Sequence, residues 1–378
     1  MGWLLPTTSV AAILLALGIG TIACTTDYSW PVPPHRAFPQ VGTRDGALLS
    51  PMQLVTITAE GDDAPPSFFF EFSRQIGKSE WWRRIAPEYG LTTLTNVAEI
   101  VGPAVDGDVT DHDVFTYITD AVAMNGGPER DGNTLYLLYL PEGVTMISEG
   151  KANTNCRNFA AYHARYGTRG DDLAVVQRCR NDPNRSTVAA SHEVIEAATD
   201  PDYAGYVLPA VARKPWTEDV WNAYELTGRA ELGDLCEGTF YFERQFFYQR
   251  VWSNAAAAAG GDPCIPELGE PFYDTTFDRD WYSVNAGATV SIPFTGWATG
   301  PLADWGLRVR VKSSTSGFDA TSSLTTFNSG RRGTLTVRAP VGAFSDSFAV
   351  VEIDSTRPAL GTPMTDGAHV NIVGVHVP

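Results

Sequence analysis

The alternation of hydrophobic and polar positions divides the chain into a part with helices and strands and a part with strands alone. Residues 53–59 are rich in β-branched side chains and residues 134–140 are almost wholly apolar, so we expect two buried strands. Residues 173–176 are a shorter candidate. Apolar residues recur at helical spacing within residues 67–89, over one or two helices, and within residues 114–122. This order indicates an α+β or α/β layered domain, and we favour α+β.

Two helices carry recognisable end signals. Thr110 is the expected N-cap of the helix at residues 114–122, with Asp113 completing a variant capping box. Ser186 is the expected N-cap of a helix over residues 187–199. Asp200 ends that helix because it precedes a proline.

The pattern changes after residue 266. Short alternating strands are predicted at residues 289–294, 307–311, 333–337, 348–353 and 369–377, with turn residues between them. Residues 272–378 contain no cysteine and have the length of one domain of this type. We therefore expect an all-β, Ig-like or fibronectin-like sandwich at residues 272–378.

The N-terminus has the character of an export signal. An uncharged apolar run ends at Cys24, within a sequence that resembles a bacterial lipobox, so residues 1–23 are the expected signal peptide and Cys24 the expected lipidated residue. Ordinary secretion and a short membrane anchor are the alternatives. Residues 24–48 are rich in proline and predict a tether. The protein is thus expected in the cell envelope as a lipoprotein, or outside the cell.

The cysteine content agrees with export, and the charge excludes one class of partner. Four cysteines remain after Cys24, and of three pairings we favour Cys156–Cys179 and Cys236–Cys264, because each closes a modest loop. A cysteine-rich metal site is the rival, but C-x-x-C spacing does not occur. The formal net charge of −17 argues against nucleic acid as a partner.

The chemistry is concentrated at His192, Glu193 and Glu196. His192 and Glu196 are four residues apart and lie on one helix face. The spacing matches H-E-x-x-H with Glu as the second ligand; in that motif two helix residues hold zinc and the intervening Glu takes a proton from the bound water. A carboxylate ligand also admits Ca²⁺ or Mn²⁺. The rival interpretation is a solvated helix face with a salt-bridged His192.

A third ligand has to come from another part of the chain. Glu231 and Asp234 are the favoured candidates, three residues apart in a loop that Cys236 can hold in place. His163 is a weaker candidate. Asp202 lies ten residues after His192, but no glycine precedes it in the turn, so we discount it.

Several motifs resemble the EXORDIUM-like, phosphate-induced protein family and its bacterial secreted relatives. They are the run HEVIEAATDP, the later ELGDLCEG and QRVW, and the earlier SEWW. The resemblance covers about residues 50–265. It implies a zincin-like domain at residues 49–266, with His192, Glu193 and Glu196 at the metal-site positions and Asp234 in the downstream acidic motif.

Together these features predict an exported, lipid-anchored or secreted metal-dependent hydrolase. The expected activity is that of a zinc peptidase, with Zn²⁺ on His192, Glu196 and Asp234 or Glu231, and Glu193 as the base. Its partner would be a peptide or cell-surface substrate, with the membrane reached through the lipid anchor. The alternative is a non-catalytic surface or adhesion protein whose zincin-like domain is structural or binds Ca²⁺.

Overall fold

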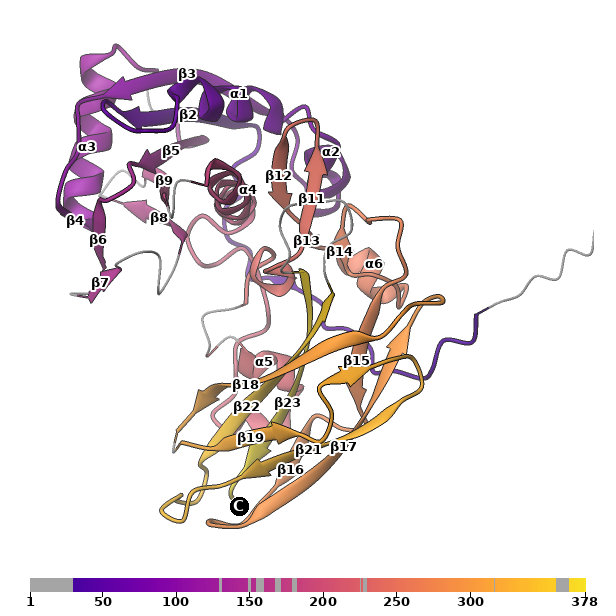
Figure 1. Ribbon diagram of the computed structural model, residues 1–378. Coiled ribbons are helices and arrows are strands. Elements are labelled where there is room, and N and C mark those ends of the chain that lie inside the picture. Colours follow the sequence, from indigo (N-terminus) through magenta and orange to yellow (C-terminus); the bar gives the residue numbers. More distant parts are fainter. Residues whose placement is uncertain are drawn as a thin grey trace, which may run out of the picture.

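A computed structural model describes residues 30–128, 131–148, 151–153, 160–166, 171–178, 182–224, 226, 230–315, 317–357 and 367–378. Figure 1 shows a part with a central sheet and helices above a part built from strands. The expected signal peptide, Cys24, Cys156 and Cys179 lie outside the described residues.

The upper part is organised around a five-stranded sheet. Its strand order is β3 (Leu94–Gly102), β2 (Met52–Ala59), β5 (Thr134–Leu140), β9 (Asp171–Gln177) and β8 (Ala161–Tyr166). The first four strands are parallel, and β8 runs antiparallel to β9 at the edge. The strands predicted at residues 53–59, 134–140 and 173–176 are confirmed.

Helices cover both faces of this sheet. The helices α1 (Pro66–Ile76) and α4 (Pro183–Thr199) share a hydrophobic core with Leu135 and Leu137 of β5. The helix α3 (Asp111–Met124) packs on the other face, where Tyr136 and Leu138 are part of a second core. Alternate residues of β5 therefore enter two cores, which explains its unbroken apolar sequence.

The helix ends are partly as predicted. Thr110 and Asp113 form the capping box of α3. The N-cap of α4 is Asp182 and not Ser186, because the Asp182 side chain accepts the backbone N–H of Asn184 and a proline is at the first position of the helix. Ser186 is buried inside the helix. Asp200 ends α4 as expected.

The other elements that precede β15 in the chain are short. They are β1 (Gly42–Thr43), α2 (Glu80–Ile85), η1 (Ala86–Tyr89), β4 (Asp108–Thr110), β6 (Thr145–Ser148), β7 (Lys151–Asn153), β10 (Tyr206–Val207), η3 (Pro215–Thr217), α5 (Val220–Tyr224), η5 (Asp234–Cys236), β11 (Phe240–Glu243), β12 (Phe246–Gln249), β13 (Val251–Trp252), α6 (Asn254–Ala258) and β14 (Cys264–Ile265). The β11–β12 hairpin packs beside α4.

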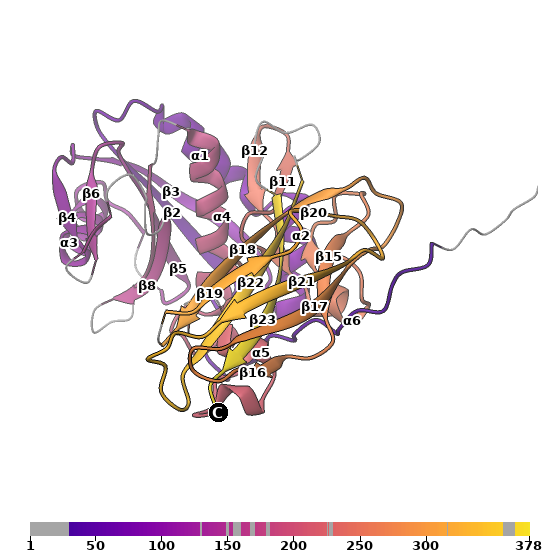
Figure 2. The ribbon, with the colours of Figure 1, turned by 60° about the horizontal axis from the view of Figure 1, so that its bottom comes forward.

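The lower part is the predicted all-β component, and Figure 2 shows its strands at the front of the molecule. One sheet has the order β15 (Tyr273–Phe277), β17 (Thr289–Ala298), β21 (Arg332–Arg338) and β19 (Asp319–Ser322). The other has the order β16 (Trp281–Ser283), β23 (Gly367–His376), β22 (Phe348–Arg357), β18 (Trp305–Ser314) and β20 (Thr326–Phe327). Inward-facing residues of both sheets form one core.

The two parts are packed together. Phe348, Val350 and Ile372, on the outer face of the second sheet, belong to the same hydrophobic core as the upper part. The hydroxyl of Tyr224 in α5 lies 3.2 Å from Glu352 of β22, to which it donates a hydrogen bond. The outer face of this sheet is therefore an intramolecular interface.

The proline-rich segment does not lie free where the structure describes it. His35 stacks on Trp297 at 3.7 Å, and Phe38 packs edge-on against Trp252 and Phe272. Residues 30–41 thus join the two parts of the chain, and the prediction of a free tether is wrong for them. The aromatic residues provide the reason, because each buries a large apolar area.

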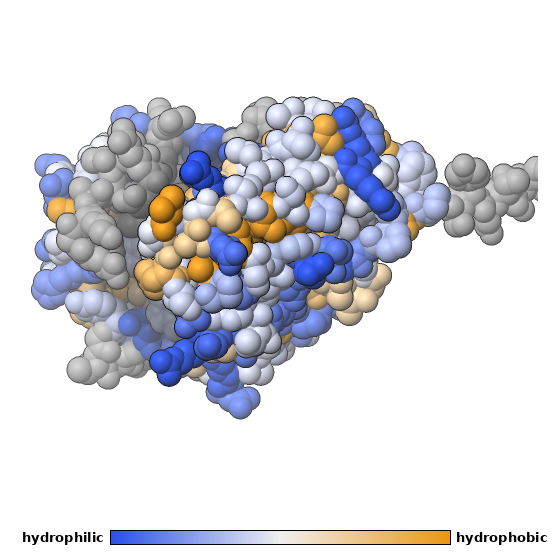
Figure 3. Space-filling model, turned by 90° about the horizontal axis from the view of Figure 1, so that it is seen from below, coloured by the Kyte–Doolittle hydropathy of each residue, from blue (hydrophilic) through white to orange (hydrophobic). Residues whose placement is uncertain are grey.

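Of the two predicted disulfides, the described residues contain Cys236–Cys264, which is confirmed. Among the helices that the structure describes, none has the length and apolar character needed to cross a membrane. Polar residues dominate the face seen from below, with apolar residues interspersed among them (Figure 3).

Candidate metal centre

The site begins on helix α4. His192 and Glu196 are one turn apart, and Nε2 of His192 lies 2.9 Å from Oε2 of Glu196. Glu193 and Glu196 are buried, at 4% and 2% exposure, so the solvated helix face considered from the sequence is wrong. Burying two carboxylates is costly unless cations or donors surround them.

The loop that begins at Glu231 completes the first group. The backbone N–H groups of Gly233 and Asp234 both donate to Oε1 of Glu196, each at 3.1 Å. Oδ1 of Asp234 lies 3.8 Å from Nε2 of His192. The loop therefore fixes the Glu196 carboxylate and places a second carboxylate beside the imidazole.

Gln249 orients the His192 ring from the opposite side. Its side-chain nitrogen lies 2.8 Å from Nδ1 of His192 and donates to the carbonyl of Gly233 at 2.7 Å. With Nδ1 engaged, Nε2 is the nitrogen that faces the carboxylates. In metal-binding histidines this second nitrogen carries a proton and donates it to an oxygen, so a metal on Nε2 requires the side-chain oxygen of Gln249, and not its nitrogen, at Nδ1. In the sequence, Gln249 was noted only as the first residue of the QRVW motif and not as a site residue.

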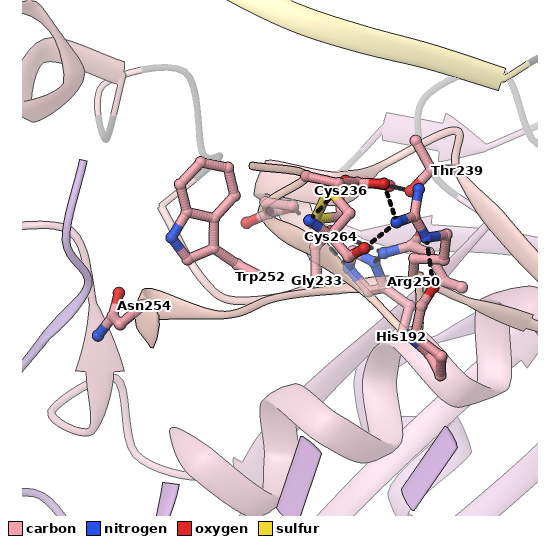
Figure 4. The surroundings of a disulfide bond; sticks show 12 residues. His192, Gly233, Cys236, Thr239, Arg250, Trp252, Asn254 and Cys264 are labelled. Atoms are coloured by element: carbon pink, nitrogen blue, oxygen red, sulfur yellow. Dashed lines mark hydrogen bonds and ion pairs between the residues drawn. A yellow bond between two sulfur atoms is a disulfide. The ribbon is translucent and has the colours of Figure 1, made fainter. Parts of the chain in front are cut away.

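The disulfide lies next to this loop. Cys236 ends η5, the turn that starts at Asp234, and is bonded to Cys264 of β14. Figure 4 shows the disulfide beside Gly233 and His192. The covalent link therefore restrains the segment that carries Asp234.

His163 enters the site from the edge strand β8. Its Nδ1 lies 3.2 Å from Oε2 of Glu193 and 3.8 Å from Oε2 of Glu196. Its Nε2 lies 3.6 Å from Oε1 of Glu231. His163 was the weaker candidate in the sequence because no local spacing links it to α4. The register of β8 beside β9 brings it there.

The carboxylates and imidazoles perturb one another strongly. Burial raises the pKa of Glu231 to about 11 and that of Asp234 to about 8, and in both cases repulsion from Glu196 adds to the effect. Burial by itself lowers the pKa of His192, but Glu196 and Glu193 outweigh it and hold that pKa well above its ordinary value. Negative charge is thus in excess here.

The donor atoms fit a divalent cation. Ligand atoms of His192, Glu196 and Asp234 all lie within 4.8 Å of one another, as the sequence predicts for three of its four ligands. Nitrogen and carboxylate oxygen donors suit Zn²⁺ and Mn²⁺. Glu231, the fourth, faces His163 instead, and its buried Oε1 has no hydrogen-bond partner among the described residues.

Asp202 lies away from the centre, where its carboxylate accepts a hydrogen bond from Arg165 at 3.3 Å. That side chain of Arg165 also pairs with Asp172. The decision to discount Asp202 as a ligand agrees with this geometry.

No protein family model matches the chain, and neither does any curated protein. Among solved structures, domains 4 and 5 of the S-layer protein SbsC match 29% of this chain and 53% of theirs, at 18% identity and a TM-score of 0.21. The six-domain SbsC structure matches with 29% and 13% coverage, 18% identity and the same score. A β-glucosidase from Listeria innocua matches 89% of this chain and 48% of its own, at 9% identity and a TM-score of 0.20. Scores this low define neither fold nor function here.

Proposed function

We propose that the protein is an exported metal-dependent hydrolase, and specifically a zinc peptidase. The observation that carries the proposal is the convergence of His192, Glu196 and Asp234, with the buried Glu193 next to them. A zinc ion held there would acidify a bound water molecule and polarise a carbonyl. Ca²⁺ is the alternative ion, because most of the donors are carboxylate oxygens.

Glu193 is the candidate base. Its Oε1 lies 3.9 Å from Nε2 of His192, and its Oε2 lies 3.2 Å from Nδ1 of His163. His163 therefore holds one carboxylate oxygen of Glu193 and leaves the other turned toward the ligand set. A carboxylate held in this way can accept a proton from water at that position.

The edge strand supports a peptide as substrate. β8 is the last strand of its sheet, and one of its residues, His163, belongs to the centre. The outer edge of such a strand can pair with an extended peptide through main-chain hydrogen bonds. A peptide added along β8 would pass beside Glu193.

The finer assignments belong to the same proposal. They are a zincin-like domain at residues 49–266, an Ig-like or fibronectin-like sandwich at residues 272–378, a lipid anchor at Cys24 and a disulfide between Cys156 and Cys179. The sheet with α4 across one face supports the first of these, and the two packed β-sheets support the second.

Exchange of Glu193 for Gln tests the catalytic part. The purified full chain is assayed for zinc content and for cleavage of a denatured protein substrate. Glu193→Gln should retain zinc and lose at least about 100-fold in rate. Glu142→Gln, at an exposed position, is the matched control. Unchanged turnover in Glu193→Gln rejects the role of Glu193, and zinc-free wild-type protein rejects the metal centre.

The burial of the centre supports a second candidate, a non-catalytic surface protein stabilised by a cation. Glu196 is 2% exposed and receives two backbone N–H groups, as in a structural site. In that case Ca²⁺ raises the midpoint temperature of thermal unfolding, and the protein cleaves no peptide. The Glu193→Gln variant and wild type would then not differ in the cleavage assay.

A further inference from the structure

The site contains a second group of possible metal ligands, built on His163 in place of His192 and Asp234. Nδ1 of His163 and carboxylate oxygens of Glu193 and Glu196 lie within 4.8 Å of one another, and all three residues are buried. Glu196 belongs to this group and also to the group with His192 and Asp234. Two candidate cation sites therefore share one carboxylate.

One ion cannot take both imidazoles in this arrangement. Ligands of a zinc ion stand about 2.0–2.2 Å from it, so two ligands of one ion are at most about 4.4 Å apart. Glu196 has a ligand atom within 4.8 Å of each imidazole, but the ligand nitrogens of His163 and His192 are not within 4.8 Å of each other. The imidazoles are thus placed for two ions.

The charge of the centre also favours two bound cations. Four carboxylates lie within 4 Å of a nitrogen of the two imidazoles, and they belong to Glu193, Glu196, Glu231 and Asp234. The ion pairs that these carboxylates make in the described part of the chain are all to His163 or His192.

An unpartnered carboxylate oxygen lies at the other nitrogen of the same imidazole. Oε1 of Glu231 is buried without a hydrogen-bond partner among the described residues, 3.6 Å from Nε2 of His163. Nε2 also lies 3.3 Å from the backbone carbonyl of Asp200, so Nδ1 is the ring nitrogen left for a cation beside Glu193 and Glu196. A buried acceptor in this state is costly unless a cation or donor compensates it.

We propose that the centre holds two divalent cations, one on His192, Glu196 and Asp234 and the other on His163, Glu193 and Glu196. The Glu196 carboxylate is shared, through the oxygen that lies 2.9 Å from His192 and 3.8 Å from His163. This inference rests on the metal centre of the proposed function and concerns its occupancy.

Metal stoichiometry tests the inference. The full chain is stripped with a chelator, reloaded with Mn²⁺ alone, desalted and analysed by elemental mass spectrometry. We expect two Mn²⁺ per chain for wild type, one for His163→Gln and one for His192→Gln. His112→Gln, at an exposed histidine on α3, is the matched control and should keep two.

The outcomes separate the two proposals. One Mn²⁺ per wild-type chain, unchanged in His163→Gln, overturns the second site and leaves the peptidase proposal standing. No bound Mn²⁺ or Zn²⁺ overturns both. The electron paramagnetic resonance spectrum of the Mn²⁺-loaded wild type provides a test without any variant. Two Mn²⁺ ions that share one carboxylate give a spin-coupled signal. An uncoupled six-line spectrum at full loading contradicts the shared site.

Discussion

Oε1 of Glu196 accepts a 3.1 Å hydrogen bond from the backbone N–H of Gly233, and this contact ties helix α4 to the loop that carries Asp234. The two residues are 37 positions apart in the chain. This bond holds the His192 and Glu196 motif of α4 next to the loop of Asp234, so that the three residues form one set of possible ligands. Three of the predictions below concern groups that hold this junction in place.

Gly233→Ala should disrupt the centre without disturbing the backbone. The φ of Gly233 is −71°, which alanine adopts freely, but a Cβ there would lie 2.7 Å from Oε1 of Glu196 and 2.8 Å from Nδ1 of His192. We expect zinc affinity, measured by competition with a chelator, to fall by about tenfold or more. Gly261→Ala is the control, since nothing lies near its Cβ. Equal affinity in the two variants would refute the role of the close approach.

Gln249→Met removes the contact to Nδ1 of His192 while keeping the side-chain length. Because outer contacts of metal-binding histidines set ring orientation, zinc affinity should drop about 10- to 100-fold. Gln53→Met serves as the control, because Gln53 pairs with Asp131 far from the centre. Calorimetric titration with Zn²⁺ measures both. An unaltered dissociation constant for Gln249→Met would show that the ring is oriented by other groups.

Replacing both Cys236 and Cys264 by serine should lower stability and loosen the loop. The bond closes a segment with a sequence separation of 28, so its loss should cost about 2–4 kcal/mol in the free energy of unfolding. Zinc affinity should fall as well, because Cys236 follows Asp234 by two residues. Urea unfolding and zinc titration check the two effects separately. A destabilised variant with full zinc affinity would mean that the loop keeps its position without the bond.

Asp274 should make the β-sandwich more stable at acid pH. Burial, followed by the charge of Asp354, raises the pKa of Asp274 to about 8, whereas its ordinary value is near 3.8. The folded state therefore binds more protons between these values, so the contribution to stability is complete below about pH 4 and is lost as the pH rises toward 8.

Asp274→Asn keeps the acceptor oxygen for Thr275 and Ser355 without a charge. It should be more stable than wild type at pH 8, by about 2 kcal/mol, and should lose the decline between pH 4 and 8. Urea unfolding across this range provides the measurement. Asp319→Asn, at an exposed site on β19, is the control. Parallel pH profiles for wild type and Asp274→Asn would contradict the assignment.

Local patterns in the sequence predicted the elements but not how they meet. The apolar run at residues 134–140 identified β5, and the capping box identified the start of α3, because both signals are set by neighbours in sequence. The strands β3, β8, β15, β16, β19 and β20 were missed, and β16, β19 and β20 have at most four residues each. The segment at residues 30–41 was misjudged because prolines outweighed its aromatic residues.

In the candidate site, too, local spacing predicted some residues and tertiary packing placed the others. The i, i+4 spacing was sufficient to pair His192 with Glu196, and the acidic loop was sufficient to suggest Asp234. His163 gained its place through the register of β8 on β9, and Gln249 through the hairpin that packs beside α4. Neither relationship has a signature in the local sequence, because both depend on tertiary packing.

The central claim is that His192, Glu196 and Asp234 hold a cation, and anomalous diffraction at the zinc edge from crystals grown with Zn²⁺ tests it most directly. We predict a peak about 2.0–2.2 Å from Nε2 of His192 and from carboxylate oxygens of Glu196 and Asp234. A Zn²⁺-saturated crystal without density at this position, or with Asp234 turned away from His192, would contradict the account.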